Sequence, residues 1–193
     1  MMTTQTVSAS LRVVTMSQSD AVPRLTHILS GLGWTVGQAS PEAPLPTGAE
    51  LIICDTKDVR LVADGLGDSL LAVIGEACAQ ADIVLSGREA KDDLAALLRL
   101  PGHDQLNSMA RTFGRAPLTP LLEGLRTELR AALAILMAGG MPDSHKLAGL
   151  AGTLGFTDAS TAWRNLDEGV SSTAQTRRAT RIAILSINHW LTS

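Results

Sequence analysis

The sequence predicts an α/β domain followed by an all-α domain, because the hydrophobic pattern changes once along its 193 residues. Before Leu100, short β-branched runs alternate with helical patterns, which is typical of β-α-β units around a parallel sheet. After Leu100 the strand patterns stop, and apolar residues recur every three or four positions, as in amphipathic helices. The Pro-Gly-His-Asp segment at 101–104 separates the two patterns. We therefore expect domains at 1–102 and 103–193.

The first domain is expected to contain a five-stranded parallel sheet. The predicted strands are 11–15, 34–38, 51–54, 70–74 and 83–85, and the predicted helices are 23–32, 59–63, 76–80 and 91–100. This alternation within about a hundred residues fits a small doubly wound, flavodoxin-like sheet, whose binding sites lie at the carboxyl ends of the strands.

The second domain is expected to be a four-helix bundle preceded by a short helix. A leucine stripe from Leu118 to Leu136, followed by two glycines, predicts one long helix. The other predicted helices are 105–113, about 142–155, 158–169 with Thr157 as N-cap, and 173–191. Short links between such helices favour antiparallel neighbours in a bundle.

Composition disfavours several classes of function. The formal net charge is −3 with 18% charged residues, so no basic surface for nucleic acid is expected. With five aromatic residues and no Tyr, there is no platform for stacking bases. Cys54 and Cys78 lack the spacing of a metal or disulfide site and are expected to be plain buried thiols. The first ten residues do not resemble a signal peptide, and the longest apolar run is too short to span a bilayer, so a cytoplasmic protein without membrane contact is expected.

His145 is the candidate reactive residue of the second domain. At about 100° per residue, the larger apolar side chains of its helix cluster opposite His145, so the imidazole is expected to face solvent. Those side chains are Leu147, Leu150, Ala151 and Leu154. The small residues Ala148, Gly149 and Gly152 share the side of His145. Each glycine within a helix costs roughly 1 kcal/mol relative to alanine, and close approach of another protein's backbone would explain that cost. An ordinary surface histidine is the alternative interpretation.

The run from His145 to Phe156, HKLAGLAGTLGF, closely resembles the phosphoacceptor helix of histidine phosphotransfer domains, which are four-helix bundles. The matching positions are His145, Leu147, Gly149, Ala151, Gly155 and the stretch 163–168. The resemblance implies that His145 is the phosphoacceptor. It also implies a partner surface formed by Lys146, Ala148, Gly149 and Gly152. The sequence departs from the family at Ala148, where many members have a lysine near the phosphoryl group.

The resemblance implies a phosphocarrier that is not an enzyme with turnover of its own. A neutral imidazole is nucleophilic near pH 7, and the partner would bring the phosphoaspartate and Mg²⁺. The partners implied are a response-regulator receiver domain and a hybrid histidine kinase, and no cofactor is expected on this chain. A different function remains open, namely a non-phosphorylated adaptor or inhibitor that binds a kinase or receiver through the bundle.

The first domain resembles a degenerate receiver. The run LIICD at 51–55 looks like a third strand that ends in the phosphoacceptor aspartate, Asp55. The acidic pair, the Thr or Ser and the Lys-Pro of receivers are replaced by residues 15–17, Gly75 and residues 86–87, respectively. Without metal and lysine nothing offsets the charge of a transferring phosphoryl group, so Asp55 is expected to be a relic or a local hydrogen-bond acceptor. Homodimerisation, kinase docking and restricted access to His145 are candidate roles for this domain.

Three further patterns receive structural interpretations. The Gly-Asp-Ser-Leu block at 67–70 resembles a serine-esterase motif, but it precedes a strand, and Ser186 stands where an aspartate would be needed near His189. His27, His103 and His189 lack the spacing of metal ligands. Three arginines of the last helix are expected to form a solvated face, with a docking contact as the alternative; they are Arg177, Arg178 and Arg181.

Overall fold

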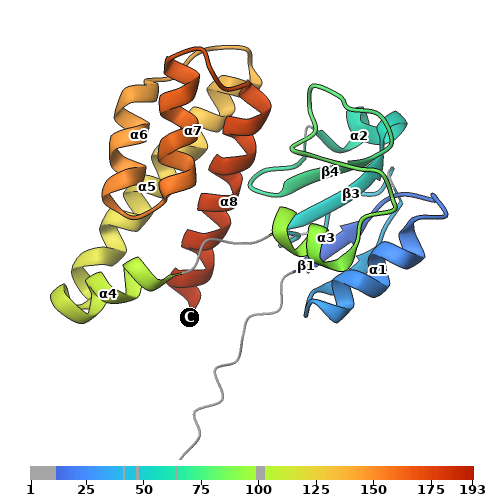
Figure 1. Cartoon of the computed structure of the whole chain (residues 1–193), viewed down its shortest axis with the longest axis horizontal. Helices are drawn as coiled ribbons and strands as arrows, with labels where there is room; N and C mark the ends of the chain where they lie inside the picture. Colours follow the sequence, from blue (N-terminus) through green and yellow to red (C-terminus); the bar gives the residue numbers. More distant parts are fainter. Residues whose placement is uncertain (1–11, 41, 47, 64, 99–102) are drawn as a thin grey trace, which may run out of the picture.

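The computed structural model describes residues 12–193 apart from 41, 47, 64 and 99–102. It contains a parallel sheet with its helices, here called the sheet half (12–98), and a group of packed helices, here called the helical half (103–193) (Figure 1). The predicted domain boundary and the end of the helix predicted at 91–100 fall on 99–102, outside the described residues.

The sheet has five parallel strands in the order β2-β1-β3-β4-β5. The strands are β1 (Arg12–Thr15), β2 (Thr35–Gln38), β3 (Leu51–Asp55), β4 (Leu70–Ile74) and β5 (Ile83–Leu85). In the register, Val13 lies beside Val36 on one side and beside Leu51 on the other. The prediction of a five-stranded parallel sheet is therefore confirmed.

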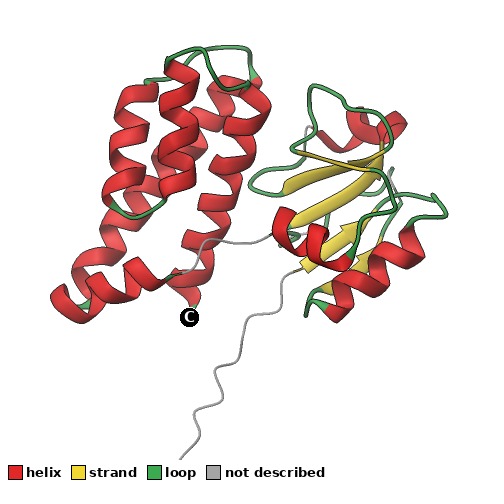
Figure 2. Cartoon of the chain, in the orientation of Figure 1, coloured by secondary structure: helices red, strands yellow, loops and turns green. Residues whose placement is uncertain are grey.

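The strand side chains alternate between two apolar cores, one on each face of the sheet. One core packs against α1 (Val22–Gly31) and α3 (Lys91–Leu97), and the other packs against α2 (Val59–Ala63), which follows the 3₁₀ turn η1 (Thr56–Asp58). Cys54 is fully buried in the second core, and this burial raises the pKa of its thiol to about 12. Figure 2 shows the helices on both faces of the sheet.

The helix predicted at 76–80 is wrong, because this segment forms turns. The backbone N–H of Ala81 donates to the carbonyl of Cys78, which closes a tight turn just before β5. A single turn of helix gains too few hydrogen bonds to offset the cost of nucleation unless packing supports it.

The helical half consists of one short helix and four that pack against one another. They are α4 (Asp104–Phe113), α5 (Arg115–Met137), α6 (Ser144–Thr153), α7 (Thr157–Asp167) and α8 (Thr173–Thr192). α6 packs closely against α7, and α5 and α7 each pack against α8. Trp163 and Trp190 are almost completely buried in their shared core. None of the helices in the described part of the chain is both long and apolar enough to cross a membrane.

The ends of these helices follow from local hydrogen bonds. The Asp143 carboxylate caps α6 by accepting from the backbone N–H of Lys146 at 2.9 Å. Ser172 and Gln175 form a reciprocal capping box at the start of α8. The prediction that Thr157 is the N-cap of α7 is wrong, because α7 already begins at Thr157, after Phe156 and without a side-chain cap.

α8 lies between the two halves and contributes to both cores (Figure 1). Ile184, Ile187 and Trp190 belong to the helical core, whereas Leu185 belongs to the sheet core. An α-helix can serve two cores in this way only if it is apolar on two faces. The two halves are therefore joined by a shared helix in addition to the chain segment between α3 and α4.

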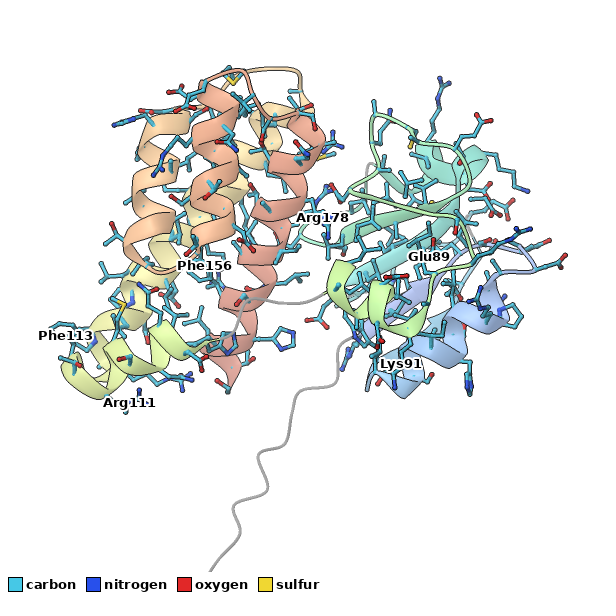
Figure 3. All side chains as sticks on the ribbon, in the orientation of Figure 1. Glu89, Lys91, Arg111, Phe113, Phe156 and Arg178 are labelled. Carbon is cyan, nitrogen blue, oxygen red and sulfur yellow. The ribbon has the colours of Figure 1, made fainter. Side chains whose placement is uncertain are left out.

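The arginines of α8 bind the sheet half, so the prediction of a solvated basic face is wrong. Arg181 pairs with Asp82, and both side chains are almost completely buried. The Arg177 guanidinium donates to the carbonyls of Ala79 and Ala81 at 2.6 and 3.2 Å. Arg178 reaches from α8 towards the sheet half (Figure 3), where it donates to the Leu97 carbonyl.

These contacts all involve the end of the sheet at which the strands begin. Glu50, which pairs with His189, precedes β3, and Asp82 precedes β5. Asp68 precedes β4 and binds Arg130 of α5, with Arg130 Nε 2.9 Å from Asp68 Oδ1. The helical half thus covers the amino edge of the sheet and leaves the carboxyl edge, where doubly wound sheets bind ligands, free of it.

His103 makes the stability of the helical half depend on pH. Its Nε2 lies 3.1 Å from the carbonyl and the hydroxyl oxygens of Ser186 on α8. Burial lowers the pKa of His103 below its ordinary value of 6.5. Because the unfolded chain then binds more protons, stability is full above pH 6.5 and falls as the pH drops through the folded pKa. We expect the Tm to fall between about pH 7 and pH 5 by less in His103→Gln than in the wild type. Equal decreases in thermal scans of the two proteins would contradict this assignment.

Candidate functional site

His145 lies in the first turn of α6 with its side chain exposed. The cap formed by Asp143 fixes the start of the helix two residues earlier, so the position of the ring is set by a defined turn. No hydrogen bond or ion pair within the described part of the chain involves the imidazole. The ring therefore presents both nitrogens to solvent.

The buried face of α6 is turned relative to the predicted one. The buried residues of this segment are Ser144, Leu147, Ala148, Ala151 and Leu154. Successive side chains of an α-helix are about 100° apart around its axis. On this measure, the mean direction of the buried side chains is turned about 45° around the axis from the mean direction of the side chains predicted to face the core. His145 consequently stands at the border of the exposed face, on the side of α7, rather than at its centre.

This rotation corrects the predictions for two residues. Ala148, predicted to belong to the partner surface, is 6% exposed, and its carbonyl accepts a hydrogen bond from the Ser160 hydroxyl at 2.8 Å. Leu150, predicted to anchor α6 in the core, is 38% exposed. The physical reason is the small size of Ala148, which lets α7 approach this side of α6 closely.

The two glycines of α6 have different surroundings. A Cβ atom at Gly149 would meet nothing within 4 Å, so this position is open to solvent. A Cβ atom at Gly152 would lie 3.0 Å from the Ser160 Oγ. Gly149 leaves free space beside His145, whereas Gly152 lets α7 pack closely on α6. Packing within the chain is thus a second explanation of Gly152, beside the predicted partner clearance.

Lys146 is exposed, but its charge is directed towards α5. Its Nζ lies 2.9 Å from Oε2 of Glu128, and both side chains are about half exposed. Exposed pairs of this kind are worth at most about 1 kcal/mol, so the pair directs the side chain without contributing much stability. Around the axis of α6, Lys146 lies about 100° from His145. The Lys146 side chain, bound to Glu128, and α7 therefore lie on opposite sides of His145.

Asp55, at the carboxyl end of β3, is held by a local hydrogen bond. The Ser17 hydroxyl donates to Asp55 Oδ1 at 2.7 Å, which confirms the expectation of a local hydrogen-bond acceptor. Across the described residues, no group of three or more His, Cys, Asp or Glu side chains could hold a metal ion. A hollow of about 490 Å³ lies nearby, and its lining includes Thr15, Ser17 and Asp20.

The esterase-like block is part of the structural framework. The Ser69 hydroxyl donates to the carbonyl of Ala49 at 2.7 Å, and Asp68 binds Arg130. His189 pairs with Glu50. The polar side chains of the Gly-Asp-Ser-Leu block thus bind neighbouring parts of the fold, in agreement with the prediction that the block is structural.

Sequence reasoning missed Ser160 and Asp82, each of which binds a distant segment. Asp82 is paired with Arg181, 99 positions later in the chain. One signal was available in the sequence, because Arg181 shares a helix face with the apolar Leu185 one turn later. A cation beside an apolar residue on one face indicates packing against another element as readily as solvation.

No protein-family model matches the chain, and comparisons with curated proteins and with solved structures find no significant match.

Proposed function

We propose that this protein is a phosphorelay carrier that accepts a phosphoryl group on His145 from a phosphorylated receiver or hybrid kinase. It then passes the group to the aspartate of a response regulator. The observation that carries this proposal is the exposed, unpaired imidazole of His145, beside the open position at Gly149. The packing of α5 to α8 against one another supports a four-helix bundle of the phosphotransfer type.

The chemistry proposed for this chain requires only a nucleophile and an accessible surface. The lone pair of a ring nitrogen forms a bond to phosphorus while the bond from phosphorus to the aspartate oxygen breaks, and its electron pair leaves on the carboxylate. The partner supplies Mg²⁺ and the cations that neutralise the transition state. This chain would act in the cytoplasm, without a cofactor of its own.

The sheet half is proposed to be a degenerate receiver. Its strand order, 2-1-3-4-5, is that of flavodoxin-like sheets, and the place of Asp55 at the end of β3 agrees with the receiver pattern. The hydrogen bond from Ser17 supports a structural role for this carboxylate. Contact with a kinase and self-association remain the proposed uses of this half.

The second candidate function is an adaptor or inhibitor that binds a kinase or receiver without being phosphorylated. The observation that favours it is the lack of a free cation on α6, since position 148 is a buried alanine and Lys146 is bound to Glu128. Both functions use the same helical surface and the same partners. They differ in whether His145 carries phosphate.

The discriminating experiment measures acid-labile phosphate on the full chain after incubation with a panel of phosphorylated receivers and hybrid kinases. We expect label on the wild type and on His27→Gln, and none on His145→Gln. His27 is a suitable control because it is an exposed histidine on α1, in the sheet half. Binding of one donor without label on the wild type would favour the adaptor.

Substitutions of Gly149 test the proposed space for the partner. Gly149→Ala should stabilise the fold by about 0.5–1 kcal/mol, because alanine is the better helix former and the position is open. Gly149→Leu should also fold, since its side chain projects into solvent, but should lower the rate of phosphotransfer from a receiver at least about tenfold. Urea unfolding and transfer rates check the two effects separately. An unchanged transfer rate in Gly149→Leu would refute the clearance argument.

A further inference from the structure

A phosphoryl group on His145 would lack a cationic partner on its own helix. The group carries close to two negative charges near neutral pH, as phosphate monoesters do. On α6, position 148 is a buried alanine, and the Lys146 ammonium is bound to Glu128 on the α5 side. The inference below rests on the proposed function and concerns the side of His145 that faces α7.

The contact between α6 and α7 fixes which residues of the two helices lie side by side. The helices run antiparallel through the tight turn at Gly155, which has a φ of +88°. The Ser160 hydroxyl of α7 bonds the carbonyl of Ala148, so these two residues lie at the same level. His145 lies about 4.5 Å from Ala148 towards the start of α6, and Arg164 lies about 6 Å from Ser160 towards the end of α7. Because the helices are antiparallel, both steps lead in the same direction and end at levels about 1.5 Å apart.

The two side chains also share the solvent side of the groove between α6 and α7. Around the axis of α7, Arg164 lies about 40° from Ser160, in the direction away from the buried face. Around the axis of α6, His145 lies about 60° from Ala148, also away from the buried face. Both residues are exposed. Packed helices have axes about 8–10 Å apart, a separation that a long arginine side chain spans.

The Arg164 guanidinium is not bound to another side chain in the described part of the chain. In the described ranges no hydrogen bond or ion pair uses it, although Asp167 and Glu168 follow on the same helix. This differs from the three arginines of α8, which are bound to the sheet half. An unpaired arginine next to a reactive histidine is available for an anion that arrives there.

We propose that Arg164 binds the phosphoryl oxygens of phosphorylated His145, so that α7 supplies the cation that α6 lacks. A guanidinium offers parallel N–H donors that match two phosphoryl oxygens, and it stays charged throughout the working pH range. Arg164 neither gives nor takes a proton in the transfer step. It favours the phosphorylated state by balancing the charge that His145 acquires.

The test uses phosphoramidate, a small donor that can phosphorylate a histidine without a partner protein. In that reaction the histidine nitrogen forms a bond to phosphorus, and the P–N bond of the donor breaks. Ammonia leaves with the protons already carried by the donor nitrogen. The rate of acid-labile labelling is measured on the full chain for the wild type, Arg164→Gln, Arg164→Lys and His145→Gln.

Arg111 provides a matched control. It is an exposed arginine on α4, labelled in Figure 3, and α4 lies beside the Gly155 turn, about 15 Å along α6 from His145. Arg111→Gln removes the same charge from the chain and should label at the wild-type rate. Urea unfolding of the Arg164 variants, expected within about 0.5 kcal/mol of the wild type, separates the effect of charge from any loss of folding.

We expect Arg164→Gln to label at least about tenfold more slowly than the wild type, and Arg164→Lys to recover to within about threefold. Equal rates for Arg164→Gln and the wild type, with His145→Gln unlabelled, would overturn the role of Arg164 and leave the proposed function intact. Equally slow labelling of the Gln and Lys variants would overturn the role of the charge. A wild type that no donor labels would overturn both proposals.

Discussion

Arg181→Met is expected to lower the free energy of unfolding by about 3–5 kcal/mol and to loosen the attachment of the helical half to the sheet. The Arg181 side chain is 1% exposed and that of Asp82 is 0% exposed. Removing the arginine leaves the Asp82 carboxylate buried, with Arg177 Nε 3.7 Å from Oδ1 as its remaining cation. An uncompensated buried charge costs far more than an exposed ion pair contributes.

A second substitution separates the buried charge from the loss of packing. In the variant with both Asp82→Asn and Arg181→Met, the site no longer holds an unpaired carboxylate. The asparagine carbonyl can still accept from the backbone N–H of Leu71, as the carboxylate does at 2.9 Å. We therefore expect the double variant to be more stable than Arg181→Met alone.

Tryptophan fluorescence in urea can follow both halves in the full chain, because Trp34 belongs to the sheet core whereas Trp163 and Trp190 belong to the helical core. To follow one core alone, the tryptophans of the other core are replaced with phenylalanine. We expect the unfolding transitions of the two cores to coincide in the wild type and to separate in Arg181→Met. Arg178→Met is the control, because Arg178 donates to a single carbonyl. A cost below about 1 kcal/mol for Arg181→Met would show that this pair does not hold the halves together.

Gly155→Ala is expected to destabilise the fold by about 2–3 kcal/mol, because Gly155 forms the turn that sets α6 against α7. Its φ of +88° is a conformation that costs an L residue roughly 1–2 kcal/mol. A Cβ atom there would also lie 2.6 Å from the Gln105 Cδ, too close for van der Waals contact. The backbone N–H of Phe156 donates to the carbonyl of Ala151 across this turn, so strain in the turn acts on the end of α6.

Two comparisons check the cause of that loss by urea unfolding. Gly149 lies within α6 at an open position, so Gly149→Ala should stabilise the fold. Adding Gln105→Ala to Gly155→Ala removes the overlap and should recover only part of the loss, since the backbone strain remains. Full recovery in the double variant would mean that the overlap alone causes the effect, and no loss in Gly155→Ala would contradict both causes.

The secondary structure was largely predictable because most elements have strong local patterns. The apolar run at 70–74 is buried in the sheet, and the leucine stripe from Leu118 to Leu136 faces the helical core. The 76–80 segment was wrongly predicted to be a helix, because a pattern of only five residues does not decide between a helix and a turn. The local hydrophobic pattern was therefore enough to predict a helix or strand where that element was long or fully buried.

The surroundings of His145 were predicted only in part, because they depend on how α6 packs. The exposure of His145 and the open space at Gly149 follow from helix periodicity. The burial of Ala148 depends on Ser160, which comes twelve residues later and on another helix. The Arg181 pair depends on a carboxylate 99 positions away, so the pattern within α8 can indicate packing at Arg181 but cannot identify its partner.

The central claim is that His145 carries a phosphoryl group from one receiver to another, and a pulse–chase experiment tests it most directly. The full chain is labelled by a phosphorylated receiver, separated from that donor, and mixed with a panel of unphosphorylated receivers. We expect no more than one acid-labile phosphate per chain, absent in His145→Gln, which leaves the chain as label appears on a receiver aspartate. A chain that binds the receivers but never takes up phosphate would contradict the account and identify the protein as an adaptor.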